Sequence, residues 1–178
     1  VCTPGDITMT NSVTSPYDPS IPAASGQARV LSGDARTFTV TWRNASTTTA
    51  YTGVGLRYVY SVPYTGHVTQ ASWSCTVTGG SQPCPSGLTG SSSIVHSNPG
   101  EPSEVVFDVT GVSFPVGQQY TVVVTLATTL NACSDTGEVG ARTYAFRSAI
   151  GTETSERRAS SLTPLPIGCT TWMLNETF

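Results

Sequence analysis

Two histidines and eleven acidic side chains are the residues of this sequence that ordinarily carry acid–base chemistry. Nucleophilic catalysis requires a His beside a Ser or Cys, with an acid to orient it. His67 and His96 both lie in turn-like contexts, and no Gly-x-Ser-x-Gly elbow occurs in the chain. Solvated loop histidines are the favoured interpretation, so we predict no catalytic residues and expect that the protein is not an enzyme.

Grouped carboxylates suggest two other chemistries, glycoside hydrolysis and calcium binding. The closest groups are Glu101, Glu104 and Asp108, and further on Asp135 and Glu138. Neither group has the spacing of a calcium loop, and the first is better explained as a charged turn before a strand. The sequence therefore predicts no metal site and no cofactor.

The five cysteines favour disulfide chemistry over metal binding. None forms a Cys-x-x-Cys pair, and the two histidines are not at ligand spacing from them. Disulfides persist in oxidising compartments, so we expect a secreted, extracellular protein at the cell surface. Cys75 and Cys84 enclose a turn with Gly79-Gly80 and are expected to pair. Cys133 can pair with Cys2 or Cys169, and alternating strand directions favour Cys2. The odd number leaves one thiol over or one bridge to another chain. The five are Cys2, Cys75, Cys84, Cys133 and Cys169.

Aromatic residues offer a possible sugar-binding platform. A Tyr-rich segment could stack on sugar rings if its side chains were exposed. Core packing is the favoured interpretation, because Tyr58 and Tyr60 share a strand face with Leu56. Trp42 and Trp73 likewise read as inward-facing core residues. The tyrosines concerned are Tyr51, Tyr58, Tyr60 and Tyr64.

Two Asn-x-Ser/Thr sequons begin at Asn44 and Asn175. The chain contains 29 Thr and 22 Ser among its 178 residues, so chance matches are expected. We attach no glycosylation to either sequon.

Composition limits which elements can position these residues. Charged residues make up 11% of the chain, against about 25% in an average domain. All eight basic residues are Arg, and the formal net charge is −3, which disfavours nucleic-acid binding. Ala, Glu, Lys and Leu are too scarce for a helical bundle. No run reaches the roughly 20 apolar residues of a membrane helix, so no membrane span is expected.

Alternation with a period of two is the dominant pattern, and it predicts strands. In 36–42, Phe38, Val40 and Trp42 face one side and Thr the other. In 142–150, we expect Tyr144 and Phe146 to point inward. Residues 79–93 are Gly-, Ser- and Pro-rich and read as a loop. The expected strands cover 7–10, 36–42, 53–62, 69–78, 104–109, 119–126 and 142–150. About seven strands at this spacing predict an all-β, immunoglobulin-like β-sandwich.

The domain organisation follows from these strands. Residues 1–150 are expected to form the sandwich, with a short N-terminal strand segment. Residues 151–178 form a C-terminal extension that returns to apolar residues and should pack on the domain or on a neighbour. Val1 is not an initiator Met, so we expect a processed or trimmed chain.

Three segments in this order resemble the DUF11-type repeat domain of prokaryotic surface proteins. They are Thr37-Phe-Thr-Val-Thr-Trp-Arg-Asn44, Ser72-Trp-Ser-Cys-Thr-Val-Thr-Gly-Gly80 with Cys84-Pro85, and Phe114-Pro-Val-Gly-Gln-Gln-Tyr-Thr-Val-Val-Val124. The resemblance covers roughly residues 5–150. Tyr58-Val-Tyr-Ser-Val-Pro63 departs from the family's more acidic segment, and the C-terminal extension has no counterpart. The resemblance implies an immunoglobulin-like extracellular module of surface layers, adhesins, stalks or filaments, without catalytic residues.

The absence of Lys bears on how such a module could assemble. Sortase-built pili and internal isopeptide bonds both need Lys, and no Leu-Pro-x-Thr-Gly motif is present. We therefore expect a non-enzymatic structural protein, a subunit of a pilus-like filament or surface array. It would assemble by strand exchange, packing or disulfide. Its partners would be copies of itself, with a host or glycan surface as a further candidate. The alternative is an adhesive or glycan-binding module that uses the Tyr-rich strand and the loops of 79–100. The assembly candidates are Ile7, Met9, Val13, Trp172 and Leu174.

Overall fold

The computed structural model describes residues 6–13, 30–31, 35–61, 68–93, 103–128, 138–146, 157–161 and 165–168. Apart from one short 3₁₀ turn, its elements are strands. They are β1 (Ile7–Val13), β2 (Val30–Leu31), β3 (Arg36–Asn44), β4 (Tyr51–Ser61), β5 (Val68–Thr78), η1 (Ser86–Leu88), β6 (Gly90–Ser93), β7 (Ser103–Phe114), β8 (Gln119–Thr128), β9 (Glu138–Phe146), β10 (Arg157–Ser161) and β11 (Leu165–Gly168).

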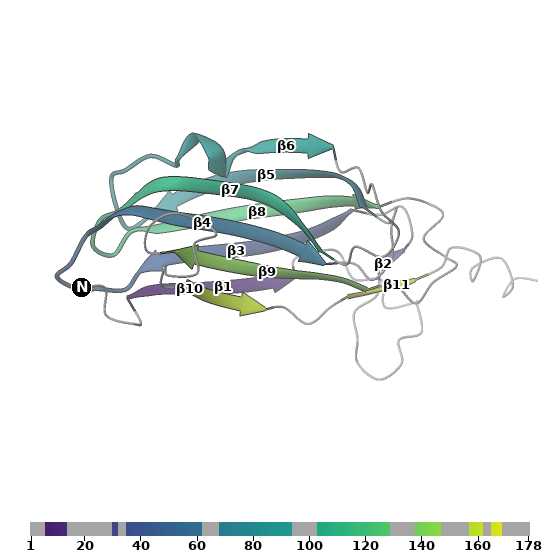
Figure 1. The fold of residues 1–178 in the computed structure, drawn as a ribbon, viewed down its shortest axis with the longest axis horizontal. Coiled ribbons are helices and arrows are strands. Elements are labelled where there is room, and N and C mark those ends of the chain that lie inside the picture. The colour runs from purple at the N-terminus through teal and green to yellow at the C-terminus, as the bar shows by residue number, and fades with distance from the viewer. Residues whose placement is uncertain are drawn as a thin grey trace, which may run out of the picture.

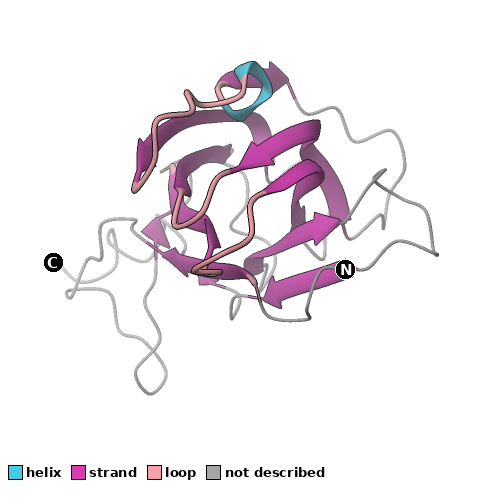
Figure 2. Ribbon diagram, turned by 90° about the vertical axis from the view of Figure 1, so that its left-hand side faces the viewer, coloured by secondary structure: helices cyan, strands magenta, loops and turns pink. Residues whose placement is uncertain are grey.

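The strands form two sheets that pack face to face (Figures 1 and 2). The first sheet has the order β1-β3-β8-β5-β6 and is antiparallel throughout. The second has the order β2-β11-β9-β4-β7, and β10 also pairs with β9. Within it, β11 and β2 pair in parallel. Two short strands from residues 151–178, β10 and β11, thus lie beside β9.

The predicted immunoglobulin-like sandwich is confirmed, with each of the seven expected strands present. Its strand order differs from that of a constant-type immunoglobulin domain, whose first sheet takes strands one, two, five and four. In this protein the sixth long strand, β8, lies between β3 and β5, and the fifth, β7, lies beside β4. The two-layer architecture is therefore that of an immunoglobulin-like sandwich. Relative to the constant-type order, however, β7 and β8 have exchanged sheets.

Aromatic side chains fill the space between the sheets. Phe38, Val40 and Trp42 on β3 are fully buried, as their alternation with Thr predicts. Phe107 on β7 lies at the centre, with its ring 5.3 Å from Trp73 and 5.8 Å from Tyr58. Rings at these separations attract one another in addition to burying apolar area, so this cluster joins the two sheets.

Two expectations about local structure were wrong. Residues 79–93 are not all loop, because η1 and β6 lie within them and β6 pairs with β5. In β9 it is Ala145 that points inward, opposite buried Leu56, while half-buried Tyr144 shares the outer face with Arg57. The side chain of Phe146 lies outside the description.

Candidate functional site

The structure brings Cys75 and Cys84 together as a disulfide, with Cα atoms 6.1 Å apart, as the enclosed turn predicts. The bridge joins the inner face of β5 to the loop that leads into η1. Cys2, Cys133 and Cys169 lie outside the described residues, so the choice of partner for Cys133 stays a prediction.

The loop held by this disulfide closes one side of the sandwich, where η1 lies over the gap between the sheets (Figure 2). Leu88 is fully buried there. The indole Nε1 of Trp73 donates to the carbonyl oxygen of Gly87 at 3.0 Å. A Cβ on Gly87 would lie 2.8 Å from a methyl of Val109, so the backbone approaches the core more closely than a larger residue allows. The loop and η1 therefore cover this side of the core, and the Leu88 side chain fills the space beneath them.

A buried polar cluster at one end of the sandwich is centred on Asn44, which ends β3. Its Nδ2 donates to the carbonyl oxygens of Thr49 at 2.8 Å and Phe114 at 3.0 Å. Its Oδ1 accepts from the backbone N–H of Ser46 at 3.0 Å. Asn44 is fully buried, and its amide is committed to holding two loops. The side chain of the Asn44 sequon is therefore held by hydrogen bonds inside the domain, a role that the sequence did not predict. The sequon at Asn175 lies outside the described part.

Gln118 extends this cluster to the disulfide loop. Its side chain is fully buried, donates from Nε2 to the carbonyl of Gln82 at 3.0 Å, and accepts from the N–H of Gln82 at 3.1 Å. The backbone carbonyl of Gln118 also accepts from the N–H of Asn44 at 2.9 Å. A Cβ on Gly80 would lie 2.2 Å from the Gln118 amide oxygen, so this contact requires glycine. Three loops are fastened to one another here.

Sequence reasoning missed both buried amides, because polar residues inside a sandwich leave no periodic signal. The available signals were local: an Asn where an alternating strand ends, and a Gln after a Pro-x-Gly turn. Tyr120 adds a third contact, since its hydroxyl donates to the carbonyl of Ser113 at 2.7 Å. This bond resembles the tyrosine corner of immunoglobulin domains, in which a strand's first Tyr bonds to backbone upstream.

The Tyr-rich strand is not a sugar-binding platform in the residues that are described. Tyr58 is fully buried and Tyr51 is 9% exposed, and the Tyr51 hydroxyl donates to the carboxylate of Asp6. Burial raises the pKa of Tyr58 well above its ordinary value. Among the described residues, the buried Tyr58 hydroxyl has no hydrogen-bond partner. The side chain of Tyr60 and all of Tyr64 lie outside the description.

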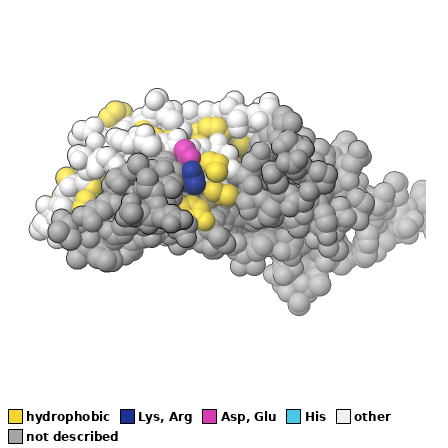
Figure 3. Space-filling model, viewed as in Figure 1, with side chains coloured by type: hydrophobic (Ala, Val, Ile, Leu, Met, Phe, Trp, Pro, Cys, Tyr) yellow, Lys and Arg dark blue, Asp and Glu magenta, His cyan; other side chains and the backbone are white. Residues whose placement is uncertain are grey.

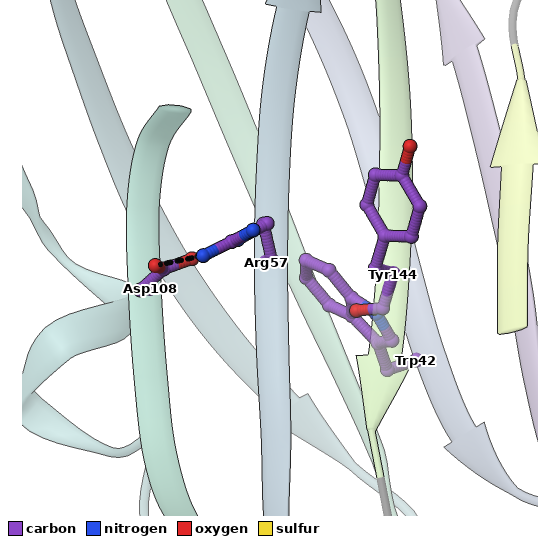
Figure 4. Close-up of polar contacts among 4 residues, drawn as sticks. All are labelled: Trp42, Arg57, Asp108 and Tyr144. Atoms are coloured by element: carbon purple, nitrogen blue, oxygen red, sulfur yellow. Dashed lines mark hydrogen bonds and ion pairs between the residues drawn. The ribbon is translucent and has the colours of Figure 1, made fainter. Parts of the chain in front are cut away.

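The outer face of the second sheet carries an ion pair between β4 and β7. Arg57 donates to both carboxylate oxygens of Asp108, at 2.6 Å and 2.7 Å (Figure 4). The hydrogen bond with Asp108 raises the pKa of Arg57. Both side chains are partly exposed, at 27% and 37%. Figure 3 shows a basic side chain beside an acidic one on the surface seen in this view, with small apolar areas next to them. Tyr144 extends from β9 on the same face, whereas Trp42 lies beneath it and donates to the Tyr144 carbonyl at 3.3 Å.

The other predicted acidic and histidine positions fall mostly on undescribed residues: His67, His96, Glu101 and Asp135. Glu104 and Glu138 lie at or near the starts of β7 and β9, and their side chains are not described. Of the first carboxylate group, Asp108 is bound to Arg57. Within the described ranges, no three His, Cys, Asp or Glu residues are placed to hold a metal ion.

The N-terminal assembly candidates lie in β1, which pairs with β3 of the same chain. Ile7 is buried in the core and Met9 packs against it, so both side chains contact their own domain. The side chain of Val13, and the whole of Trp172 and Leu174, lie outside the description. Among the described elements, no helix is long and apolar enough to cross a membrane.

No protein-family model matches this chain, and no curated protein matches it. Solved structures do resemble it in fold. The macrocyclization catalyst AvmM of alchivemycin A biosynthesis aligns at a TM-score of 0.51 and 12% identity, covering 92% of this chain and 89% of its own. The RrgB pilus protein of Streptococcus pneumoniae aligns at 0.39 and 12%, with 80% of this chain and 23% of that one. A collagen-binding domain of a Staphylococcus aureus adhesin aligns at 0.32 and 11%, with 90% and 98%. The chain thus spans under a quarter of the full-length pilus protein.

Proposed function

We propose that this protein is a non-enzymatic structural module of the cell exterior that associates with copies of itself in a pilus-like filament or surface array. The observation that carries the proposal is the weakly charged outer surface of the first sheet, where Thr37, Thr39 and Thr41 of β3 typify the outward residues. Copies with such faces repel one another little at close range. The disulfide between Cys75 and Cys84 supports an oxidising, extracellular location.

The sandwich also offers a route for strand addition. In the described part of the chain, the twelve-residue strand β7 pairs only with β4, so its other side has unpaired backbone groups. An extended segment of a neighbouring copy can pair with such an edge. Association through this edge or through packed faces needs no Lys, consistent with a chain that contains none.

We also propose that the sandwich belongs to the DUF11-type repeat family. The first resembling segment ends at Asn44, the second ends at the disulfide loop, and the third begins with the turn before Tyr120. Hydrogen bonds of Asn44 and Gln118 join these three places. The three motifs thus have one structural role in common, which supports the resemblance.

Sedimentation velocity and electron microscopy of the full chain, with and without reductant, test the main proposal. We expect assemblies that grow with protein concentration. Non-reducing gels would identify any disulfide-linked fraction. Monomers alone at high concentration, in both redox states, would contradict self-association. The alternative function, glycan binding through the Tyr-rich strand, loses support because Tyr51 and Tyr58 are buried.

A further inference from the structure

Side chains on the outer face of the first sheet stand in regular ranks across its strands. The strand registers define four ranks of four outward positions, which we call the hydroxyl face. Thirteen of these sixteen positions are Ser or Thr, and the exceptions are Arg43, Gln119 and Val123. The ranks are Thr8–Arg43–Gln119–Thr78, Thr10–Thr41–Thr121–Thr76, Ser12–Thr39–Val123–Ser74 and Thr37–Thr125–Ser72–Ser91.

The hydroxyl face is open to solvent. Its members on β1, β5 and β6 are exposed, as are Arg43 and Val123, and its remaining members on β3 and β8 are partly exposed. The hydroxyls of Thr10 and Thr41 are hydrogen-bonded to each other, and Gln119 donates from Nε2 to the Thr121 hydroxyl at 3.1 Å. Each hydroxyl has one donor and two acceptor sites, so such contacts leave capacity for a ligand.

We propose that the hydroxyl face binds a neutral, extended polysaccharide whose chain runs along the ranks, across the strands. Neighbouring strands lie about 4.8 Å apart, so a rank presents hydroxyls at a step close to the length of one sugar unit in an extended glycan. Sugar hydroxyls donate and accept, as Ser and Thr hydroxyls do. The rank Thr10–Thr41–Thr121–Thr76 offers this pairing at four successive positions.

Charge and shape distinguish this ligand from other occupants. Arg43 is the single charged residue among the sixteen, so an anionic polymer finds little attraction. Val123 is the single large apolar one, at 38% exposed, so a membrane or a second copy gains little apolar burial. Neighbouring strands rotate by about 20–25°, which turns the ranks out of one plane. A flexible chain follows that twist, whereas a rigid crystal face such as ice does not.

Binding by one copy is expected to be weak. Each exchanged hydroxyl hydrogen bond contributes little net free energy, and no aromatic ring lies among the sixteen positions to stack on sugars. Many copies on one polysaccharide would bind more strongly through effective concentration. The site requires that copies associate through other surfaces, such as the edge of β7, so that the hydroxyl face stays open; association of that kind would raise its avidity.

The test measures depletion of the full-length protein by acid-swollen, amorphous cellulose and chitin, whose chains can follow the twist, with soluble alginate as the anionic comparison. The double variant Thr41→Val/Thr121→Val removes two central hydroxyls and keeps side-chain volume and strand propensity. We expect it to bind about tenfold more weakly than the wild type. Thr110→Val is the matched control, since Thr110 is exposed on β7 of the other sheet and should bind as the wild type does.

Several results would overturn the proposal. These are retention on neither polysaccharide, equal loss in Thr110→Val, or tighter binding to alginate than to cellulose and chitin. Inhibition of ice recrystallisation that the double variant abolishes would reassign the face to ice. A sedimentation change confined to the double variant, without loss of polysaccharide binding, would reassign it to a second copy. Thr76→Ala, at an exposed position of the same rank, should weaken binding if the double variant does not fold. Unchanged binding by a folded Thr76→Ala would then count against the proposal.

Discussion

Two tyrosines of the sandwich core differ in what their hydroxyls contact. The buried Tyr58 hydroxyl has no hydrogen-bond partner in the part of the chain that the structure describes, while the Tyr120 hydroxyl donates to the Ser113 carbonyl. Burying a polar group without a hydrogen bond is costly, so Tyr58→Phe should raise the free energy of unfolding by about 1 kcal/mol. Tyr120→Phe should lower it by about 1 kcal/mol because the Ser113 carbonyl loses its donor. Urea denaturation of both variants tests this contrast, which fails if the two substitutions shift stability in the same direction.

The same burial makes stability depend on alkaline pH. The pKa of Tyr58 is raised in the folded protein, whereas in the unfolded chain it is about 10. Above that pH the unfolded state loses the proton and the folded state keeps it, so stability is full below about pH 10 and falls above it. The slope for one such group approaches about 1.4 kcal/mol per pH unit. Between pH 8 and 11, the free energy of unfolding should therefore fall less steeply in Tyr58→Phe than in the wild type. Identical slopes would show that Tyr58 ionises equally in both states.

Asn44 is the residue on which the loops at one end of the sandwich depend. Replacement by Ala removes the donor to the Thr49 and Phe114 carbonyls and the acceptor for Ser46 N–H. Asn44→Ala should therefore lower the free energy of unfolding by about 2–3 kcal/mol. Thr47→Ala, at an exposed position of the same turn, should change it by less than about 0.5 kcal/mol. Equal effects in thermal unfolding would mean that the Asn44 contacts are not stabilising.

At the scale of elements, we expect the disulfide loop, η1 and β6 to open and close together, because the Cys75–Cys84 bridge holds all three against the core. Nine positions separate Cys75 from Cys84, and the bridge holds Leu88 in the gap between the sheets. Cross-linking so short a loop restricts the unfolded chain by about 2–3 kcal/mol. The double variant Cys75→Ser/Cys84→Ser should lose that much stability. Because Leu88 would leave the core more often, faster backbone hydrogen exchange is expected in residues 85–93 than in β3. Uniform exchange across the domain would contradict the idea that the disulfide holds this segment in place independently of the rest of the sandwich.

Strand prediction from sequence succeeded where one face is apolar and the other polar. In β3, Phe38, Val40 and Trp42 alternate with Thr, and both the strand and its inward face were predicted correctly. β6 was missed because Gly90–Ser93 contains no apolar residue, so its pairing with β5 rests on backbone hydrogen bonds and on the disulfide loop that precedes it. A strand at a sheet edge that contains no apolar residue shows no alternation of apolar and polar residues, so sequence patterns cannot detect it.

The phase of β9 shows a second physical limit. Side-chain size suggested that Tyr144 points inward, yet small Ala145 does so, because large Leu56 and Tyr58 on β4 already fill the adjoining core. Which face a strand buries depends on the volumes of strands beside it, and these become neighbours only in the fold. The candidate site had the same limit: the disulfide was predictable from spacing, whereas the Asn44–Gln118 cluster required the three loops to be placed together.

For the whole molecule, the low charge of the surface means that ionic contacts should contribute little to association between copies. The chain has 8 basic and 11 acidic residues among 178, and the hydroxyl face contains one charged side chain among sixteen. Salt screens ionic contacts over about 10 Å at 0.1 M and about 3 Å at 1 M, but leaves apolar packing and strand pairing in place. Self-association, measured by sedimentation between about 0.1 and 1 M NaCl, should therefore change by less than about threefold. Weakening by tenfold or more would mean that ion pairs join the copies, and the Arg57–Asp108 pair on the second sheet would be the first to test. Asp108→Asn would then remove the salt dependence, whereas under packing or strand addition it would leave assembly unchanged.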